Sequence, residues 1–378
     1  MKERSVFRPV RLLLMITVLC LGLPLCASAV ETGTCGEHLT WTLADNGVLT
    51  IAGFGEMDDW TAAPWPDPAA VTRVAFMGEP GQVTTMTDLG EETVIESYDG
   101  ITSIGDHAFD GCTALTEAEI PATVTRIGES AFANCALLAE AVLPDSVTSI
   151  GRGCFSRCAS LTSVRLPAGI TEISSAMFSN CTGLTSVTFP AGLETVGGNA
   201  FEGCTGLTAV TLPPQTASVG MSAFMNCTGL TSVSFGGSLT VIGDMAFYGC
   251  TSLKVIILPA TVGEIKYRAF HNCAVTAILY GGTAEQWGQI VISSTGNGCL
   301  TTATLHCGIG DALILPDDLT VIGPQAFANL PEVGAIRIPA GVTTIAVDAF
   351  DPGVILFVPA GSDWVQWAAD NGYTAIEE

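Results

Sequence analysis

A period of 23 residues runs through most of the sequence and restricts what the chain can fold into. Phenylalanines recur at this spacing in eight consecutive units, and a cysteine follows each of them three residues later. In seven of the eight units a leucine stands six residues after the phenylalanine, from Leu115 to Leu253. The two main columns are Phe109, Phe132, Phe155, Phe178, Phe201, Phe224, Phe247 and Phe270, and Cys112, Cys135, Cys158, Cys181, Cys204, Cys227, Cys250 and Cys273. This self-similarity predicts a solenoid, because one short unit buries its apolar side chains only against its neighbours.

The unit that begins at Phe178 indicates the secondary structure of each coil. Leu184, Val187 and Phe189 have the spacing of a short strand, and Pro190 ends that strand because proline has no backbone donor. A second short extended segment follows before the next phenylalanine. The expected fold is therefore a β-rich solenoid of 23-residue coils. Neighbouring coils should lie ~4.8 Å apart, with a parallel sheet along one side.

Units such as Cys204-Thr-Gly-Leu-Thr-Ala-Val-Thr-Leu-Pro213 resemble the bacterial surface-antigen (BspA-type) leucine-rich repeats. The resemblance extends over Ile101–Ala349. It implies a curved leucine-rich-repeat solenoid on an exported bacterial protein, often an adhesive or host-contacting one. It does not imply a particular ligand.

The start of the chain has the pattern of a secretory leader. Basic residues precede an apolar stretch from Leu12 to Leu25, and Ala27-Ser28-Ala29 has the small residues of a cleavage site. We therefore predict a signal peptide over residues 1–29 and a secreted or cell-surface mature chain. No later segment has the ~18 uninterrupted apolar residues of a membrane span. The net charge of −24 argues against binding to nucleic acid, which it would repel.

The remaining organisation follows from the repeat and its interruptions. We expect an N-terminal β cap region over 30–100, eight repeats over 101–280, an insert within the solenoid over 281–310, two further repeats over 311–350 and a C-terminal cap over 351–378. Asn46-Gly47 predicts a hairpin turn in the first cap. In the second cap, Ser362 is expected to cap a short helix through Trp364 and Trp367 that ends at Asn371-Gly372. The insert is interpreted as a decorated coil of one solenoid rather than as a second domain.

Twelve cysteines remain after the leader, and their chemical state has two interpretations. The slot of the cysteine column holds Leu330 in a later unit, which favours buried thiols that act as small apolar side chains. Stacked Cα atoms at ~4.8 Å also lie within the disulfide range, so bridged neighbours are the alternative. Cys299 and Cys307 flank a short part of the insert, where a local bridge is a second option. A line of single sulfurs is unlike the four-ligand set of zinc, so no metal site is predicted.

The sequence contains no nucleophile, phosphate-binding or metal motif. Its four histidines, His38, His107, His271 and His306, stand apart from one another. We therefore predict a protein that is not an enzyme and has no cofactor.

Side chains between the core positions of each strand are expected to point outward, and their character changes along the array. The first units are acidic there and the last are apolar: Glu117, Glu119 and Glu140 against Val255, Ile257, Ile278 and Tyr280. Either the insert covers the apolar residues, with Trp287 over them, or they form a contact patch for a protein or glycan. The acidic residues would suit a basic partner or calcium. The preferred function is a non-catalytic adhesion or host-interaction surface for an extracellular protein or glycan, and the alternative is a cell-envelope scaffold without a specific ligand.

Overall fold

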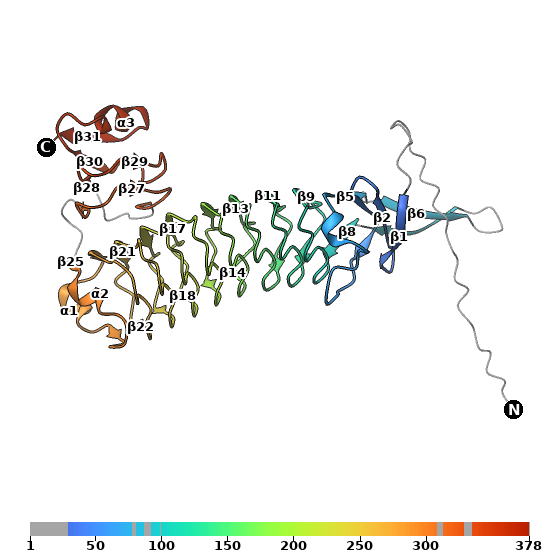
Figure 1. Cartoon of the computed structure of the whole chain (residues 1–378), viewed down its shortest axis with the longest axis horizontal. Helices are drawn as coiled ribbons and strands as arrows, with labels where there is room; N and C mark the ends of the chain where they lie inside the picture. The colour runs from blue at the N-terminus through green and yellow to red at the C-terminus, as the bar shows by residue number, and fades with distance from the viewer. Residues whose placement is uncertain are drawn as a thin grey trace.

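The computed structural model describes residues 29–77, 81–86, 92–98, 100–307, 313–328 and 335–377. The predicted leader, apart from its last residue, and Leu330 lie outside these ranges. Residues 100–307, the main array, form a long stack of coils, and residues 313–377, the C-terminal repeats, form a shorter stack beside one end of it (Figure 1). Among the described residues, no helix is long and apolar enough to cross a membrane.

Each coil of the main array contributes two strands. The front strands are β9 (Glu117–Glu119), β11 (Glu140–Val142), β13 (Ser163–Arg165), β15 (Ser186–Thr188), β17 (Ala209–Thr211), β19 (Ser232–Ser234), β21 (Val255–Leu258), β23 (Ala277–Tyr280) and β25 (Thr304–Cys307). The back strands are β8 (Ile101–Ile104), β10 (Arg126–Ile127), β12 (Ser149–Ile150), β14 (Glu172–Ile173), β16 (Thr195–Val196), β18 (Ser218–Val219), β20 (Val241–Ile242), β22 (Glu264–Ile265) and β24 (Val291–Ile292). Neighbours pair in parallel at a 23-residue offset in most coils, as in Ser163 with Ser186 and Val164 with Val187. The predicted solenoid and its parallel sheet are confirmed.

The predicted phenylalanine column forms the centre of the core. All eight side chains from Phe109 to Phe270 are fully buried. Their rings stack in sequence, with neighbouring centroids 5.0 to 5.7 Å apart. At the N-terminal end Trp65 stacks on Phe109 at 5.8 Å and closes the column. This stacking fixes the spacing of the coils from inside, in addition to the backbone ladders.

The cysteine column has a hydrogen-bonding role that the sequence did not reveal. The carbonyl of Phe201 accepts a bond from the backbone N–H of Cys204 at 3.1 Å and a second one from the thiol of Cys227 at 3.1 Å. The same thiol-to-carbonyl contact recurs between every pair of coils from Phe109 to Cys273. All twelve cysteines in the described residues are free thiols. Cys299 joins the column by donating to the Phe270 carbonyl at 3.3 Å, so the structure uses it as a further rung.

The N-terminal cap begins as the hairpin that Asn46-Gly47 predicts. Its strands β1 (Ala29–Gly36), β2 (Leu39–Ala44) and β3 (Val48–Gly53) pair antiparallel, and Gly47 has a φ of +81° that suits the turn. β3 then pairs in parallel with β5 (Arg73–Met77), which pairs with β9, so the cap continues the front sheet. The other elements of the cap are β4 (Gly55–Glu56), the 3₁₀ turn η1 (Pro68–Ala70), β6 (Gly81–Met86) and β7 (Glu92–Tyr98).

The insert forms the last coil of the main array. It contains the short helices α1 (Ala284–Trp287) and α2 (Cys299–Thr302). Its strand β24 pairs with β22, and β25 pairs with β23. No described strand of the C-terminal repeats pairs with β24 or β25.

The C-terminal repeats have sheets of their own. β26 (Leu313–Ile314), β28 (Ala335–Arg337), β30 (Ile355–Val358) and β31 (Thr374–Glu377) form one sheet, and β27 (Val321–Ile322) pairs with β29 (Thr344–Ile345). This arrangement differs from the single continuous solenoid expected from the sequence. The helix α3 (Trp364–Asp370) lies where it was expected, but Ser362 does not cap it. Asp363 holds the N-cap position and makes no side-chain capping bond.

Candidate binding face and cleft

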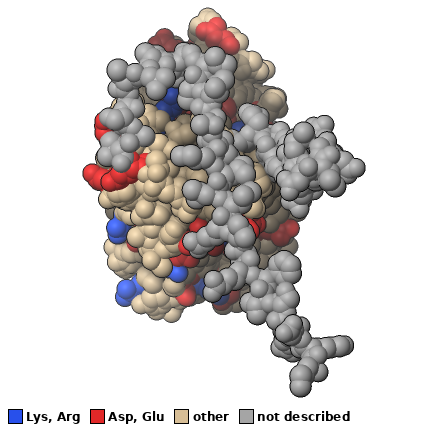
Figure 2. Space-filling model, turned by 90° about the vertical axis from the view of Figure 1, so that its right-hand side faces the viewer, with Lys and Arg blue, Asp and Glu red and all other residues tan. Residues whose placement is uncertain are grey.

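The outer face, defined as the side chains of the front strands that point away from the core, is acidic and open at its N-terminal end. Glu117, Glu119 and Glu140 are exposed on β9 and β11, and Glu117 lies directly opposite Glu140 in the ladder. The Arg73 Nε atom lies 4.0 Å from a carboxylate oxygen of Glu117. Val142, on the same face, has 59% of its surface exposed. Figure 2 views the molecule from this end and shows Asp and Glu side chains at several places on the visible surface.

Two of the predicted apolar residues do point outward, but they are buried. Val255 and Ile257 are 0% and 3% exposed because the C-terminal repeats pack on them. Leu313 and Leu315 belong to the same apolar cluster. The cover is therefore a pair of later repeats, and Trp287 of the insert does not contribute to it.

The structure places the other two predicted residues, Ile278 and Tyr280, on the inner face. Ile278 pairs with the core residue Ile256, and Tyr280 belongs to the main core, where its ring lies 5.4 Å from Trp287. The reason is a missing residue before β23: the buried Val275 follows Cys273 by two positions, whereas in earlier coils the leucine follows the cysteine by three. A shift of one residue turns every side chain of a strand to the other face. The sequence contains a sign of this shift: the unit of Phe270 is the one of the eight without a leucine six positions after its phenylalanine.

The outward positions of β23 are consequently Ala277 and Leu279, and Leu279 contacts the C-terminal repeats. No sequence argument singled these two residues out. The shifted register, once recognised, would have identified them.

Polar contacts also join the C-terminal repeats to the outer face. The Lys254 ammonium donates to Asp318 Oδ2 at 2.7 Å and to the Asp318 carbonyl at 2.9 Å. The Thr211 hydroxyl donates to the backbone carbonyl of Gln325. At Gly323 an added Cβ would lie 2.8 Å from the Thr208 hydroxyl, so the absence of a side chain permits the close approach. Sequence reasoning identified none of these contacts, because they join residues more than 60 positions apart.

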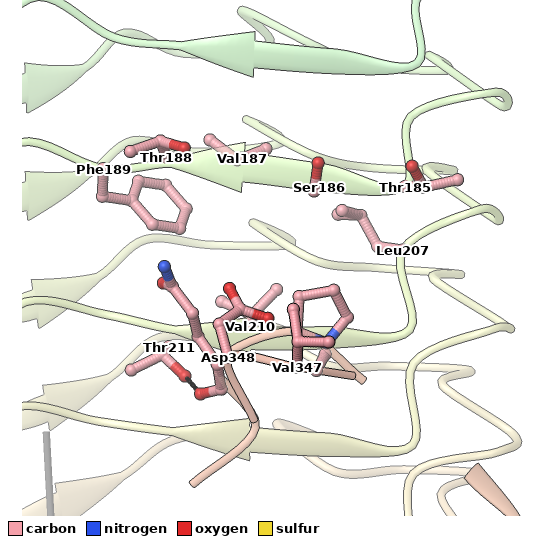
Figure 3. A pocket seen from close by; sticks show the side chains of 13 residues that line it. Thr185, Ser186, Val187, Thr188, Phe189, Leu207, Val210, Thr211, Val347 and Asp348 are labelled. Carbon is pink, nitrogen blue, oxygen red and sulfur yellow. Dashed lines mark hydrogen bonds between the residues drawn. The ribbon is translucent and has the colours of Figure 1, made fainter. Parts of the chain in front are cut away.

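A cleft of about 400 Å³ lies where the C-terminal repeats meet β15 and β17 (Figure 3). Its floor includes Val187 and Phe189, which are only half-buried, whereas Val164 and Leu166 at the same positions of the previous coil are buried. The cleft is lined by Thr185, Ser186, Val187, Thr188, Phe189, Leu207, Ala209, Val210, Thr211, Pro324, Gln325, Val347 and Asp348. It thus combines apolar floor residues with hydroxyl, amide and carboxylate groups.

The buried thiols and a histidine–carboxylate pair are titratable groups of the main array with defined surroundings. Burial raises the pKa of the Cys112 and Cys181 thiols to about 12, which keeps them protonated at neutral pH. His107 Nδ1 lies 3.0 Å from Asp110 Oδ2 in one turn of the first coil. In the part of the chain that the structure describes, no three His, Cys, Asp or Glu side chains come together in a way that could hold a metal ion. The arrangement offers a surface and a cleft for contact.

Solved structures of bacterial leucine-rich repeat proteins are similar to this chain. One from Bacteroides ovatus is 20% identical, with a TM-score of 0.41 over 90% of this chain and 98% of that chain. One from Eubacterium ventriosum is 21% identical, with a TM-score of 0.42 over 86% and 95%. A leucine rich cell surface protein from Faecalibacterium prausnitzii is 21% identical, with a TM-score of 0.40 over 93% and 95%. No protein of curated function matches the chain.

The repeats themselves match a family description. Six copies of the BspA type leucine rich repeat region match residues 91–197, 171–297 and 305–353, which together are more than half of the chain. The chain belongs to the BspA-type leucine-rich repeat family.

Proposed function

We propose that this chain is an exported, non-catalytic binding protein that contacts a protein ligand with the open part of its outer face, from β9 to β15. The observation that carries the proposal is the division of that face. Its downstream part is covered by the C-terminal repeats, whereas Glu117, Glu119 and Glu140 are exposed to solvent. A ligand with basic residues would match this acidic surface and the overall charge of −24.

Rigidity supports a binding role for this surface. The outward side chains stand on strands whose spacing is fixed by backbone ladders and by the stacked phenylalanine rings behind them. A surface that is ordered before binding loses little conformational entropy on contact, so more of the interaction energy appears as affinity. The negative charge would also speed the encounter with a basic partner at low ionic strength.

The test is a binding screen of residues 30–378 against extracellular matrix proteins and glycans. The variant E117K/E119K/E140K reverses the charge of the proposed face. The matched control E129K/E172K/E194K makes the same charge change at three exposed glutamates outside the front strands. We expect the first variant to weaken binding of a protein hit about tenfold or more at low salt, and the control to change it little. Equal effects of both variants, or hits confined to glycans, would contradict the proposal.

A cell-envelope scaffold is the second candidate, and one observation favours it. The apolar part of the outer face is already occupied by the chain itself, so it needs no external partner. A scaffold predicts that no ligand in the same screen depends on Glu117, Glu119 or Glu140.

Export is part of the proposal and has its own test. Residues 1–29 have the basic start, apolar stretch and small-residue end of a leader. We expect the mass of the protein recovered outside its cells to correspond to a chain beginning at residue 30. Recovery of the intact chain only from the cytoplasm would contradict this part of the proposal.

A further inference from the structure

The front sheet of the main array is interrupted at one place. Within residues 100–307, β15 and β17 are the one neighbouring pair of front strands that forms no ladder. The coils nevertheless stay stacked elsewhere, since Val196 pairs with Val219 in the back strands and the rings of Phe178 and Phe201 lie 5.4 Å apart. The opening is therefore local to the front of the array.

This interruption makes core side chains reachable from the outer face. Val187 and Phe189 are half-buried, although their positions are inner ones in the other coils. Figure 3 shows the side chains of β15, β17 and the C-terminal repeats around one hollow. Val347, on the wall contributed by the C-terminal repeats, has 65% of its surface exposed. The hollow thus has an apolar floor, and its wall from the C-terminal repeats combines Pro324 and Val347 with the polar Gln325 and Asp348.

We infer that this cleft receives an aromatic or bulky apolar side chain of the bound protein, while the acidic residues upstream contact its basic residues. The inference rests on the proposed function and specifies the chemistry of the partner. The volume of about 400 Å³ lies within the range of ~300–1,000 Å³ typical of ligand pockets. Large apolar anchors that enter a pocket, surrounded by polar contacts, supply most of the affinity of protein interfaces. Charge complementarity with Glu117 and Glu140 on the same face favours a protein over an uncharged small molecule.

The geometry also predicts the spacing of the partner's residues. Glu140 lies two front strands before β15, and Glu117 lies three before it. At ~4.8 Å per strand, the two glutamates are ~12 and ~17 Å from the middle of the opening. An extended peptide rises ~3.3 Å per residue. Basic residues should therefore stand about four to five positions from the aromatic one.

The experiment uses a phage-displayed library of random 12-residue peptides selected on the mature chain. We expect enriched sequences to combine Trp, Tyr or Phe with Lys or Arg about four to five positions away. For one enriched peptide, V347D should weaken binding at least tenfold because it replaces an apolar wall residue with a second carboxylate beside Asp348. The matched control V291D alters a valine of equal exposure, 65%, on β24 outside the cleft, and should leave binding unchanged. T188W, which adds bulk at an exposed position of the cleft lining, should weaken binding in the same way.

The outcomes separate this inference from the proposed function. Basic peptides without an aromatic residue, sensitive to E117K/E119K/E140K but not to V347D or T188W, would overturn the cleft inference and keep the proposed function. Aromatic peptides sensitive to V347D but not to the charge reversal would overturn the basic partner and, with it, the proposed face. No enrichment over an unrelated acidic protein would count against both.

Discussion

The main array and the C-terminal repeats are built from the same unit but bury it differently. Phenylalanines stack in both, at 5.0 to 5.7 Å in the main array and at 5.9 Å between Phe327 and Phe350. The main array encloses its own core, whereas the core of the C-terminal repeats includes Ala209, Val255 and Ile257 of the outer face. The difference indicates that two coils do not bury their apolar side chains alone and complete their core on a longer array.

The two regions also differ at the cysteine position. In the main array each thiol donates to the phenylalanine carbonyl of the preceding coil, as Cys227 does to Phe201. Three residues after Phe350 the C-terminal repeats have Gly353, which has no side chain to make this bond. Each coil of the main array is therefore joined to the preceding one by a thiol-to-carbonyl hydrogen bond that Gly353 cannot make. We expect the two regions to unfold separately.

The largest expected effect is on the free energy of unfolding, when a phenylalanine is removed from the column of either region. F201A removes a fully buried ring in the middle of the main array and should lower its free energy of unfolding by about 3–5 kcal/mol. F350A removes the equivalent ring of the C-terminal repeats. Its effect should be confined to those repeats, as measured by hydrogen exchange alongside urea unfolding. An equal loss of protection in both regions with F350A would show that they form one cooperative unit.

The second prediction concerns the contact between the two regions. I257S places a hydroxyl into the apolar cluster shared by both and should weaken the contact by about 2–3 kcal/mol. The control V142S changes an exposed residue on the open part of the same face and should have little effect. Protease sensitivity of residues 313–377 is the measurement. If both variants leave it unchanged, the apolar cluster does not hold the C-terminal repeats in place.

The third prediction uses the buried thiols, which the main array has and the C-terminal repeats lack at the matching position. Burial raises the pKa of Cys181 from its ordinary 9.0 to about 12. Above pH 9 the unfolded chain loses the Cys181 proton and the folded chain keeps it, so the stability present below pH 9 is lost as the pH rises toward 12. The slope is about 1.4 kcal/mol per pH unit for one thiol.

Comparison of the wild type with C181A isolates this thiol from the other titrating groups. Urea unfolding of both proteins at pH 8, 9 and 10 should show a shallower decline for C181A, by the slope of one thiol. Parallel declines would mean that Cys181 ionises in the folded chain as readily as in the unfolded one. Hydrogen exchange of the C-terminal repeats should respond less to the same change in pH.

The sequence was sufficient to predict those parts of the fold that follow from a local motif or from the regular repeat. The 23-residue coils, the buried phenylalanine column and the hairpin at Asn46-Gly47 all come from residues close in sequence or regular in spacing. The inner position of Tyr280 was missed because one deleted residue changes the face of a strand, and hydrophobic character alone does not distinguish an inner Tyr280 from an outer one. The length and composition of the insert 281–310 likewise did not indicate that the sheets of the main array end with this insert.

The cleft and the cover of the outer face depended on contacts between distant segments. Thr211 and Gln325 are 114 positions apart, and neither belongs to a recognisable motif. Val255 and Ile257 are apolar and outward, as the sequence indicated, but the two alternatives it offered were a cover by the nearby insert and an open contact patch, and the structure places the C-terminal repeats on them instead. The insert is the nearest segment in sequence and was therefore the expected cover in the first of these alternatives. The C-terminal repeats pack there instead, because two repeats alone do not bury all of their apolar side chains.

The smallest expected effect concerns the ion pair between the two regions. Lys254 donates both to the carboxylate and to the backbone carbonyl of Asp318, with its side chain 25% exposed and that of Asp318 62% exposed. K254M removes both bonds and should weaken the contact by about 0.5–1 kcal/mol, whereas D318N keeps the backbone bond and should cost less. The control K266M breaks a 3.9 Å pair with Glu264 inside the main array and should not change the contact. Protease sensitivity of residues 313–377, measured at low and high salt, gives the comparison. A D318N effect as large as that of K254M would assign the contact to the carboxylate charge, and the effect should then disappear at high salt.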